Sequence, residues 1–213
     1  MKKRSDQSNS LSVSKREKRG YLPVTAILLV VVTLLSSCAP SGTEPSPSGV
    51  PDGAEQCQPG TETGTYTCLG LSDHEITLTG VPDKVLPYLL SVPPEREEEL
   101  RQAEKEGTGC IFAIVGDLAF YDTDNNLVTD FSQTPVTLTY SFNEKDMDEF
   151  EVCKNSLVDQ NLVADPGEVE FLPVYFSDKW QPFPEGTSSV DGNLAAVTVT
   201  SWGDQPFGGG TKP

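Results

Sequence analysis

The stretch Thr134–Phe142, TPVTLTYSF, decides the fold class because apolar and polar residues alternate strictly along it. One face carries Val136, Leu138, Tyr140 and Phe142, and the other carries small hydroxyl residues. Successive side chains of a β-strand point to opposite sides of the sheet. The pattern therefore predicts an antiparallel strand with one face buried and the other face in water.

Further candidate strands lie on both sides of this stretch. Leu194–Trp202, LAAVTVTSW, repeats the alternation, and Cys110–Val115 and Leu118–Tyr121 are apolar runs around a kink at Gly116-Asp117. The shorter candidates are Thr65–Leu69, Ile76–Thr79, Leu127–Phe131, Phe171–Phe176 and Lys179–Phe183. Many short strands separated by turns predict an all-β fold, an antiparallel immunoglobulin-like β-sandwich. The tail from Pro206, PFGGGTKP, is expected to be frayed.

One segment between the strands has a helical composition. Pro94–Gly107, PEREEELRQAEKEG, begins with proline, ends with glycine, and places Glu97 four residues before Arg101. Few apolar residues lie along it, so we predict one short, charged, solvated helix inserted between strands. A partner-binding helix is the alternative, although such a helix requires a larger apolar face.

The N-terminal segment has the parts of a secretory signal. Basic residues precede an apolar run from Tyr21 to Leu35, and Leu35-Ser36-Ser37-Cys38 follows. This ending resembles the lipobox of bacterial lipoproteins, which implies cleavage before Cys38 and lipidation of that cysteine. A transmembrane helix is the alternative, but the run is short for a span of about 20 residues. We expect a signal peptide at 1–37, a flexible Pro/Ser/Gly tether at 38–55 and a single β-sandwich domain at 56–213.

The remaining cysteines predict two disulfides. With Cys38 lipidated, Cys57, Cys68, Cys110 and Cys153 remain, an even number in an exported domain. Of the three possible connectivities, we favour Cys57–Cys68 together with Cys110–Cys153. A structural zinc site is a poor alternative because no Cys-x-x-Cys occurs and the chain has one histidine.

The charge balance limits the class of partner. The chain carries 32 acidic and 15 basic residues, and seven of the basic residues precede Cys38. An acidic domain repels phosphate backbones, so no nucleic-acid partner is expected. We expect contact with the membrane through the lipid on Cys38, and a possible protein partner in the cell envelope.

Few residues of the sequence are candidates for catalysis. His74 is the one histidine, and its position before a strand predicts an exposed turn. No Gly-x-Ser-x-Gly surrounds a serine, so a nucleophile paired with His74 is not indicated. A pair of carboxylates can hydrolyse substrates without histidine, and two acids facing each other in a cleft would indicate such a hydrolase.

The segment Asp122-Thr123-Asp124-Asn125-Asn126 has two interpretations. Oxygen ligands at Asp122, Asp124 and Asn126 repeat the start of an EF-hand-type calcium loop, so calcium is a candidate ligand there. Leu127 replaces the glycine of that motif, and Gln133 stands where it has glutamate. The preferred interpretation is a hairpin turn.

Aromatic residues gather near the C-terminal strands: Tyr175, Phe176, Trp180, Phe183 and Trp202. They can stack on a sugar or a peptide, but at strand spacing we expect them to fill the core. The segments LAFYDTDNNLVTDF, PVTLTYSF, VYFSDKWQPF and AAVTVTSW together resemble the ZU5-like sandwich modules of bacterial surface proteins. The resemblance covers 111–207 and implies a scaffolding or adhesive role. Some relatives cleave themselves at His-Phe-Ser, where this chain has Thr200-Ser201-Trp202-Gly203, so self-cleavage is not expected.

These observations predict a lipid-anchored lipoprotein on the extracytoplasmic face of the cell membrane. We expect a non-enzymatic binding or structural module at the cell surface. The alternatives are a module that binds calcium or another ligand, and a carboxylate-dependent hydrolase.

Overall fold

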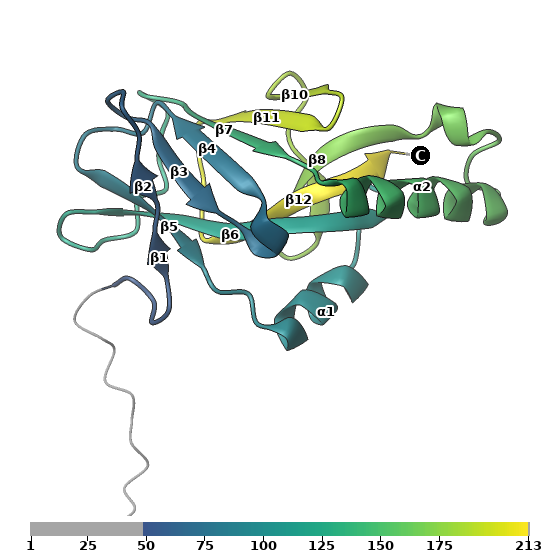
Figure 1. Ribbon diagram of the computed structural model, residues 1–213, viewed down its shortest axis with the longest axis horizontal. Coiled ribbons are helices and arrows are strands. Elements are labelled where there is room, and N and C mark those ends of the chain that lie inside the picture. Colours follow the sequence, from purple (N-terminus) through teal and green to yellow (C-terminus); the bar gives the residue numbers. More distant parts are fainter. Residues whose placement is uncertain (1–48, 213) are drawn as a thin grey trace, which may run out of the picture. The chain divides into compact units, whose positions relative to one another are not determined.

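The computed structural model describes residues 49–212, which form two antiparallel six-stranded sheets (Figure 1). The first sheet has the order β1-β5-β6-β12-β8-β9. Its strands are β1 (Glu55–Gln56), β5 (Val85–Leu90), β6 (Ile111–Asp122), β12 (Gln205–Lys212), β8 (Glu170–Phe176) and β9 (Trp180–Pro182). The second sheet has the order β10-β11-β7-β4-β3-β2. Its strands are β10 (Ser188–Asp191), β11 (Leu194–Val199), β7 (Val136–Ser141), β4 (Glu75–Thr79), β3 (Tyr66–Leu69) and β2 (Gln58–Pro59).

The alternating stretch forms β7, at the centre of the second sheet between β11 and β4. Leu138 and Tyr140 are buried, whereas Thr137 and Thr139 are only half-buried. The buried face packs against Phe120 and other residues of the first sheet in one continuous core. The predicted antiparallel β-sandwich is therefore confirmed.

The strand β6 is a single strand where the sequence predicted two strands around a kink. It runs without interruption through Gly116-Asp117 and pairs with β5 on one side and β12 on the other. The irregularity lies in its pairing with β12, where the register shifts between Phe207 and Gly208 and again between Gly209 and Gly210. Such shifts bend a strand without ending it.

The prediction of a frayed C-terminal tail is wrong. Residues Gln205–Lys212 form β12, which lies between β6 and β8 and is buried along most of its length. Glycine is required here because neighbouring atoms approach the backbone closely. A Cβ on Gly208 would lie 2.1 Å from the backbone oxygen of Ala113, and a Cβ on Gly209 would lie 2.4 Å from Cζ of Phe112.

We expect Gly208→Ala to lower the free energy of unfolding by about 1–3 kcal/mol, because the added methyl group forces two central strands apart. Chemical denaturation measures the effect. Gly203→Ala is the matched control, since its Cβ would lie no closer than 3.7 Å to another atom. Equal stability of the Gly208→Ala variant and the unmodified chain would show that this segment is not a packed central strand.

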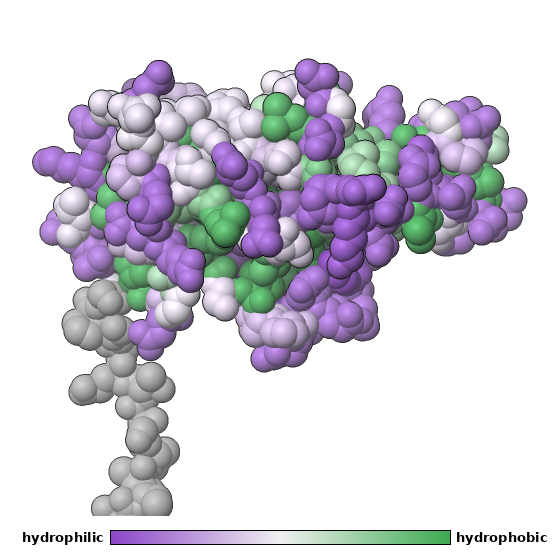
Figure 2. Space-filling model, viewed as in Figure 1, coloured by the Kyte–Doolittle hydropathy of each residue, from purple (hydrophilic) through white to green (hydrophobic). Residues whose placement is uncertain are grey.

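The charged helix is present as α1 (Pro94–Gln102), which is shorter than predicted. It lies on the outer face of the first sheet, where its buried Leu100 joins a small cluster with Ile114 and Val174. The indole Nε1 of Trp180 donates a hydrogen bond of 2.6 Å to the carbonyl of Leu100. Figure 2 shows mostly hydrophilic residues over this helix. Docking at Leu100 therefore holds a helix that has little apolar face of its own.

A second helix, α2 (Glu144–Asp159), was not predicted. It begins with a capping box, in which Asn143 and Asp146 each bind the other's backbone N–H. Its buried residues Phe150, Cys153 and Leu157 recur at helical spacing. The capping-box pattern Asn-x-x-Asp, followed by apolar residues at helical spacing, indicates the start of a helix. Glutamate is more common than aspartate at the last position of that pattern.

Both predicted disulfides are confirmed. Cys57 is bonded to Cys68 and Cys110 to Cys153, with 11 and 43 residues of sequence separation. The second bond joins the start of β6 to α2, where Phe150 packs on Phe112 at 5.3 Å between ring centroids. This bond therefore fixes α2 against one end of the core.

Smaller differences concern the ends and edges of the sheets. The stretch Leu127–Phe131 makes only isolated bridges, and the strands β1, β2, β5 and β10 were not predicted. Among the residues that the structure describes, no helix is long and apolar enough to cross a membrane. The predicted signal peptide, the lipidated Cys38 and most of the tether lie outside the described residues.

Candidate functional site

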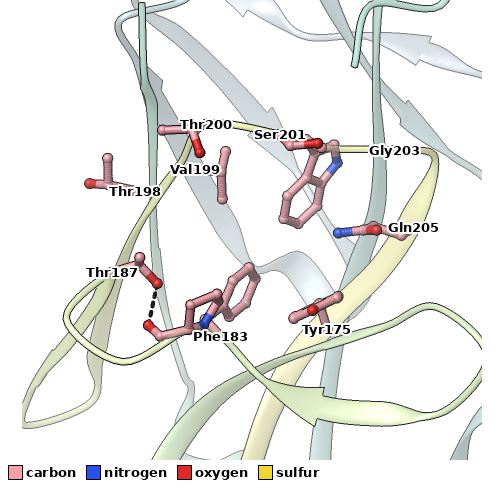
Figure 3. A pocket seen from close by; sticks show the side chains of 11 residues that line it. Tyr175, Phe183, Thr187, Thr198, Val199, Thr200, Ser201, Gly203 and Gln205 are labelled. Carbon is pink, nitrogen blue, oxygen red and sulfur yellow. Dashed lines mark hydrogen bonds between the residues drawn. The ribbon is translucent and has the colours of Figure 1, made fainter. Parts of the chain in front are cut away.

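A pocket of about 300 Å³ opens where the pairing of β10 with β11 ends. The last bond is that from the backbone N–H of Thr198 to the carbonyl of Thr187, at 2.8 Å. Beyond it the two chain segments separate, and 183–187 forms one wall while 198–203 forms the other (Figure 3). The first sheet contributes Tyr175 from β8 and Gln205 from β12.

Aromatic rings form the base of this pocket. The rings of Phe183 and Trp202 are stacked, with centroids 5.9 Å apart and planes 11° apart. The ring of Tyr175 lies 4.9 Å from that of Phe183. Trp202 is nearly fully buried, and its Nε1 donates a hydrogen bond of 2.7 Å to the carbonyl of Leu118. These contacts make the base of the pocket rigid.

The rim of the pocket is polar and uncharged. None of its 11 lining residues is acidic or basic. Two of its hydroxyls are already paired, because Thr187 donates to the carbonyl of Pro184 and Thr198 pairs with Thr137. No other side chain in 49–212 makes a hydrogen bond to the remaining polar groups of the rim, which belong to Tyr175, Thr200, Ser201 and Gln205. These four groups remain open to a ligand.

The structure separates the predicted aromatic residues into two sites. Trp180 is fully buried under α1, and Phe176 packs on it with ring centroids 5.5 Å apart. Trp202, Phe183 and Tyr175 surround the pocket instead. The expectation of a core role is correct for Trp180, and Trp202 both fills the core and lines the pocket.

The segment from Asp122 to Asn126 forms a tight turn. Asp122 Oδ1 accepts backbone N–H bonds from Asp124 at 2.8 Å and from Asn126 at 2.9 Å, and Asn125 has a positive φ. Bonds from the side chain and backbone of Asn126 lower the pKa of the Asp122 carboxyl. The carboxylate is thus occupied by N–H donors of its own turn. Calcium binding by Asp122, Asp124 and Asn126 stays a prediction, although residues 49–212 contain no cluster of three or more acidic, histidine or cysteine side chains able to hold a metal ion.

The prediction of an exposed His74 is wrong. The residue is 4% exposed, and its Nε2 shares a hydrogen bond of 2.6 Å with Oδ2 of Asp146. Its Nδ1 donates to the carbonyl of Leu71. The contact between His74 and Asp146 therefore joins the loop before β4 to the first turn of α2. Neither nitrogen is free to act as a general base.

A pair of carboxyls lies on the outer face of the first sheet. Burial and the nearby Asp204 raise the pKa of Asp117 to about 7, while Arg96 of α1 opposes the shift. Oδ1 of Asp117 is buried and accepts no hydrogen bond from any described residue. Burial, Asp204 and Asp117 also raise the pKa of Tyr121. Asp204 lies between Gly203 and Gln205, both of which line the pocket.

Sequence reasoning missed most of this site. The aromatic residues were identified, but the polar rim was not, and Asp117 was predicted only to form part of a kink between two strands. The walls of the pocket come from segments far apart in the chain, and nothing in their local patterns distinguishes them from ordinary strand ends. The structure does not bring Asp122 or His74 to the pocket.

No protein-family model matches this chain, and comparison with curated proteins and with solved structures finds no significantly similar protein.

Proposed function

We propose that this chain is a lipid-anchored lipoprotein whose β-sandwich holds a ligand outside the membrane without transforming it. The observation that supports binding is the pocket beside β10 and β11, with its rigid aromatic base and four polar groups that no side chain of residues 49–212 pairs. Concave sites with an apolar base and a few converging polar groups are typical of ligand binding. The lipobox at Leu35-Ser36-Ser37-Cys38 supports the anchor.

The experiment is a screen of small fragments by saturation-transfer NMR against the full chain in mild detergent. Fragments that bind the pocket are expected to lose their signal in the Thr200→Trp variant, in which an indole fills the opening. Thr79→Trp is the matched control, because Thr79 is an exposed threonine of β4 that does not line the pocket. A Cys38→Ala variant is expected to lose the incorporation of labelled fatty acid and to bind the same fragments.

Fragments that bind the unmodified chain and the Thr200→Trp variant equally would contradict a role for this pocket. A screen in which nothing binds would contradict the binding function itself.

A carboxylate-dependent hydrolase is the second candidate. The observation that favours it is the contact of Asp117 with Asp204, because a carboxyl with a pKa near neutrality can act as a general acid. The pair lies on the outer face of the first sheet, and neither carboxyl lines the pocket. The binding function is therefore ranked first.

A further inference from the structure

The composition of the pocket limits the charge of its ligand. All 11 lining residues are uncharged, in a chain whose formal net charge is −17. An anion would find no basic side chain among the lining residues. A cation would find no carboxylate among the lining residues. The ligand that fits is neutral.

The rim limits the polarity of the ligand. The hydroxyls of Tyr175, Thr200 and Ser201 and the amide of Gln205 each donate and accept hydrogen bonds. A purely apolar ligand would cover these groups without pairing them, which costs free energy. The ligand therefore carries several groups that also donate and accept, and hydroxyl groups meet this requirement.

The base and the size of the pocket limit the shape of the ligand. Phe183, Val199 and Trp202 offer an apolar surface opposite the polar rim, and a volume of about 300 Å³ is at the lower end for ligand pockets. A sugar ring has an apolar C–H face and a rim of hydroxyls, so it matches both surfaces. Figure 3 shows Thr200 and Ser201 across the pocket from Phe183.

We infer that this pocket binds one ring of an uncharged sugar, with the C–H face toward Phe183 and Trp202 and the hydroxyls toward Thr200, Ser201 and Gln205. The inference rests on the proposed binding function and names its class of ligand. The ring is either a free monosaccharide or one unit of a glycan, because the same chemistry recognises both.

The test titrates the full chain in detergent with glucose, galactose, mannose and N-acetylglucosamine, each as the monosaccharide and as a linear trisaccharide. Calorimetry or saturation-transfer NMR measures the affinity. At least one neutral sugar is expected to bind about tenfold more tightly than glucuronic acid and than cyclohexanol, a ring with a single hydroxyl. A tighter trisaccharide would identify a glycan as the source, and equal affinity would identify the free sugar.

Two variants locate the binding. Gln205→Glu is expected to weaken binding about tenfold, because it replaces the amide donor with a charge. Tyr175→Phe is expected to weaken it about threefold through the loss of one hydroxyl. Gln58→Glu introduces the same charge on the exposed strand β2, away from the pocket, and is expected to leave the affinity unchanged.

Equal weakening by Gln205→Glu and Gln58→Glu would overturn the inference, and so would a sugar affinity that neither pocket variant changes. If no sugar binds, but an uncharged peptide or another fragment binds and Thr200→Trp blocks that binding, the inference of a sugar ligand is overturned. The proposed binding function then still stands. If neither sugars nor fragments bind, the inference of a sugar ligand and the proposed binding function are both wrong.

Discussion

Replacing Asp146 with alanine is expected to lower the free energy of unfolding by about 2–4 kcal/mol. Asp146 is 7% exposed, and its Oδ2 shares a hydrogen bond of 2.6 Å with His74 Nε2 and accepts one of 2.9 Å from the backbone N–H of Asn143. Its removal leaves the buried Nε2 of His74 without a hydrogen-bond partner and the first turn of α2 without half of its capping box. Denaturation with urea or guanidinium measures the loss.

Two further variants separate these contributions. Asp146→Asn keeps an oxygen that can accept both hydrogen bonds but removes the charge, so an intermediate loss is expected. Asp148→Ala removes an exposed carboxylate from the same helix and is expected to change stability by less than about 0.5 kcal/mol. If Asp146→Ala and Asp148→Ala were equally stable, the buried pair would not stabilise the fold.

The stability of the chain is expected to depend on the protonation of Asp117. Its folded pKa of about 7 lies above the ordinary value of 3.8, so between these pH values the folded chain holds a proton that the unfolded chain has released. The contribution of this group to stability is therefore largest at low pH and is lost as the pH rises through about 7. Between pH 5 and pH 8 the loss amounts to about 3 kcal/mol.

The Asp117→Asn variant isolates this contribution, because asparagine keeps the shape of the side chain and does not titrate. The difference in free energy of unfolding between the variant and the unmodified chain is expected to shift by about 3 kcal/mol in favour of the variant from pH 5 to pH 8. Asp204→Asn is expected to reduce the pH dependence, since Asp204 is the charge that opposes ionisation of Asp117. A difference that is the same at both pH values would show that Asp117 is ionised throughout this range.

Several features of the fold were predictable because a short stretch of chain contains them. The alternation in Val136–Ser141 predicted β7, and the alternation in Leu194–Val199 predicted β11. The charged helix was predictable from its proline, its glutamates and its ion pair, which joins Arg101 to Glu97 at 2.8 Å. The disulfides were predictable because two bonds joining four cysteines allow few arrangements.

The candidate site was predictable only in its aromatic residues. The C-terminal strands carry Tyr175, Phe183 and Trp202, and the structure places all three around the pocket. The polar rim could not be predicted, because threonine also occupies outward-facing positions of strands away from the pocket, such as Thr77 in β4 and Thr139 in β7. The contact of Asp117 with Asp204 likewise joins residues whose local sequences resemble ordinary turns and strands.

The sequence by itself determined the class of fold and the charged helix, because the period of side chains along a strand or helix is a local property. For the disulfides it favoured one of three pairings, and the structure shows that pairing. Only the tertiary structure determined the role of the glycine-rich C-terminal strand, which has no side-chain pattern and is ordered by its hydrogen bonds to β6 and β8. The same holds for His74 and Asp146, which are 72 residues apart. Burial and pairing of such groups depend on which distant segments become neighbours, and no local pattern contains that information.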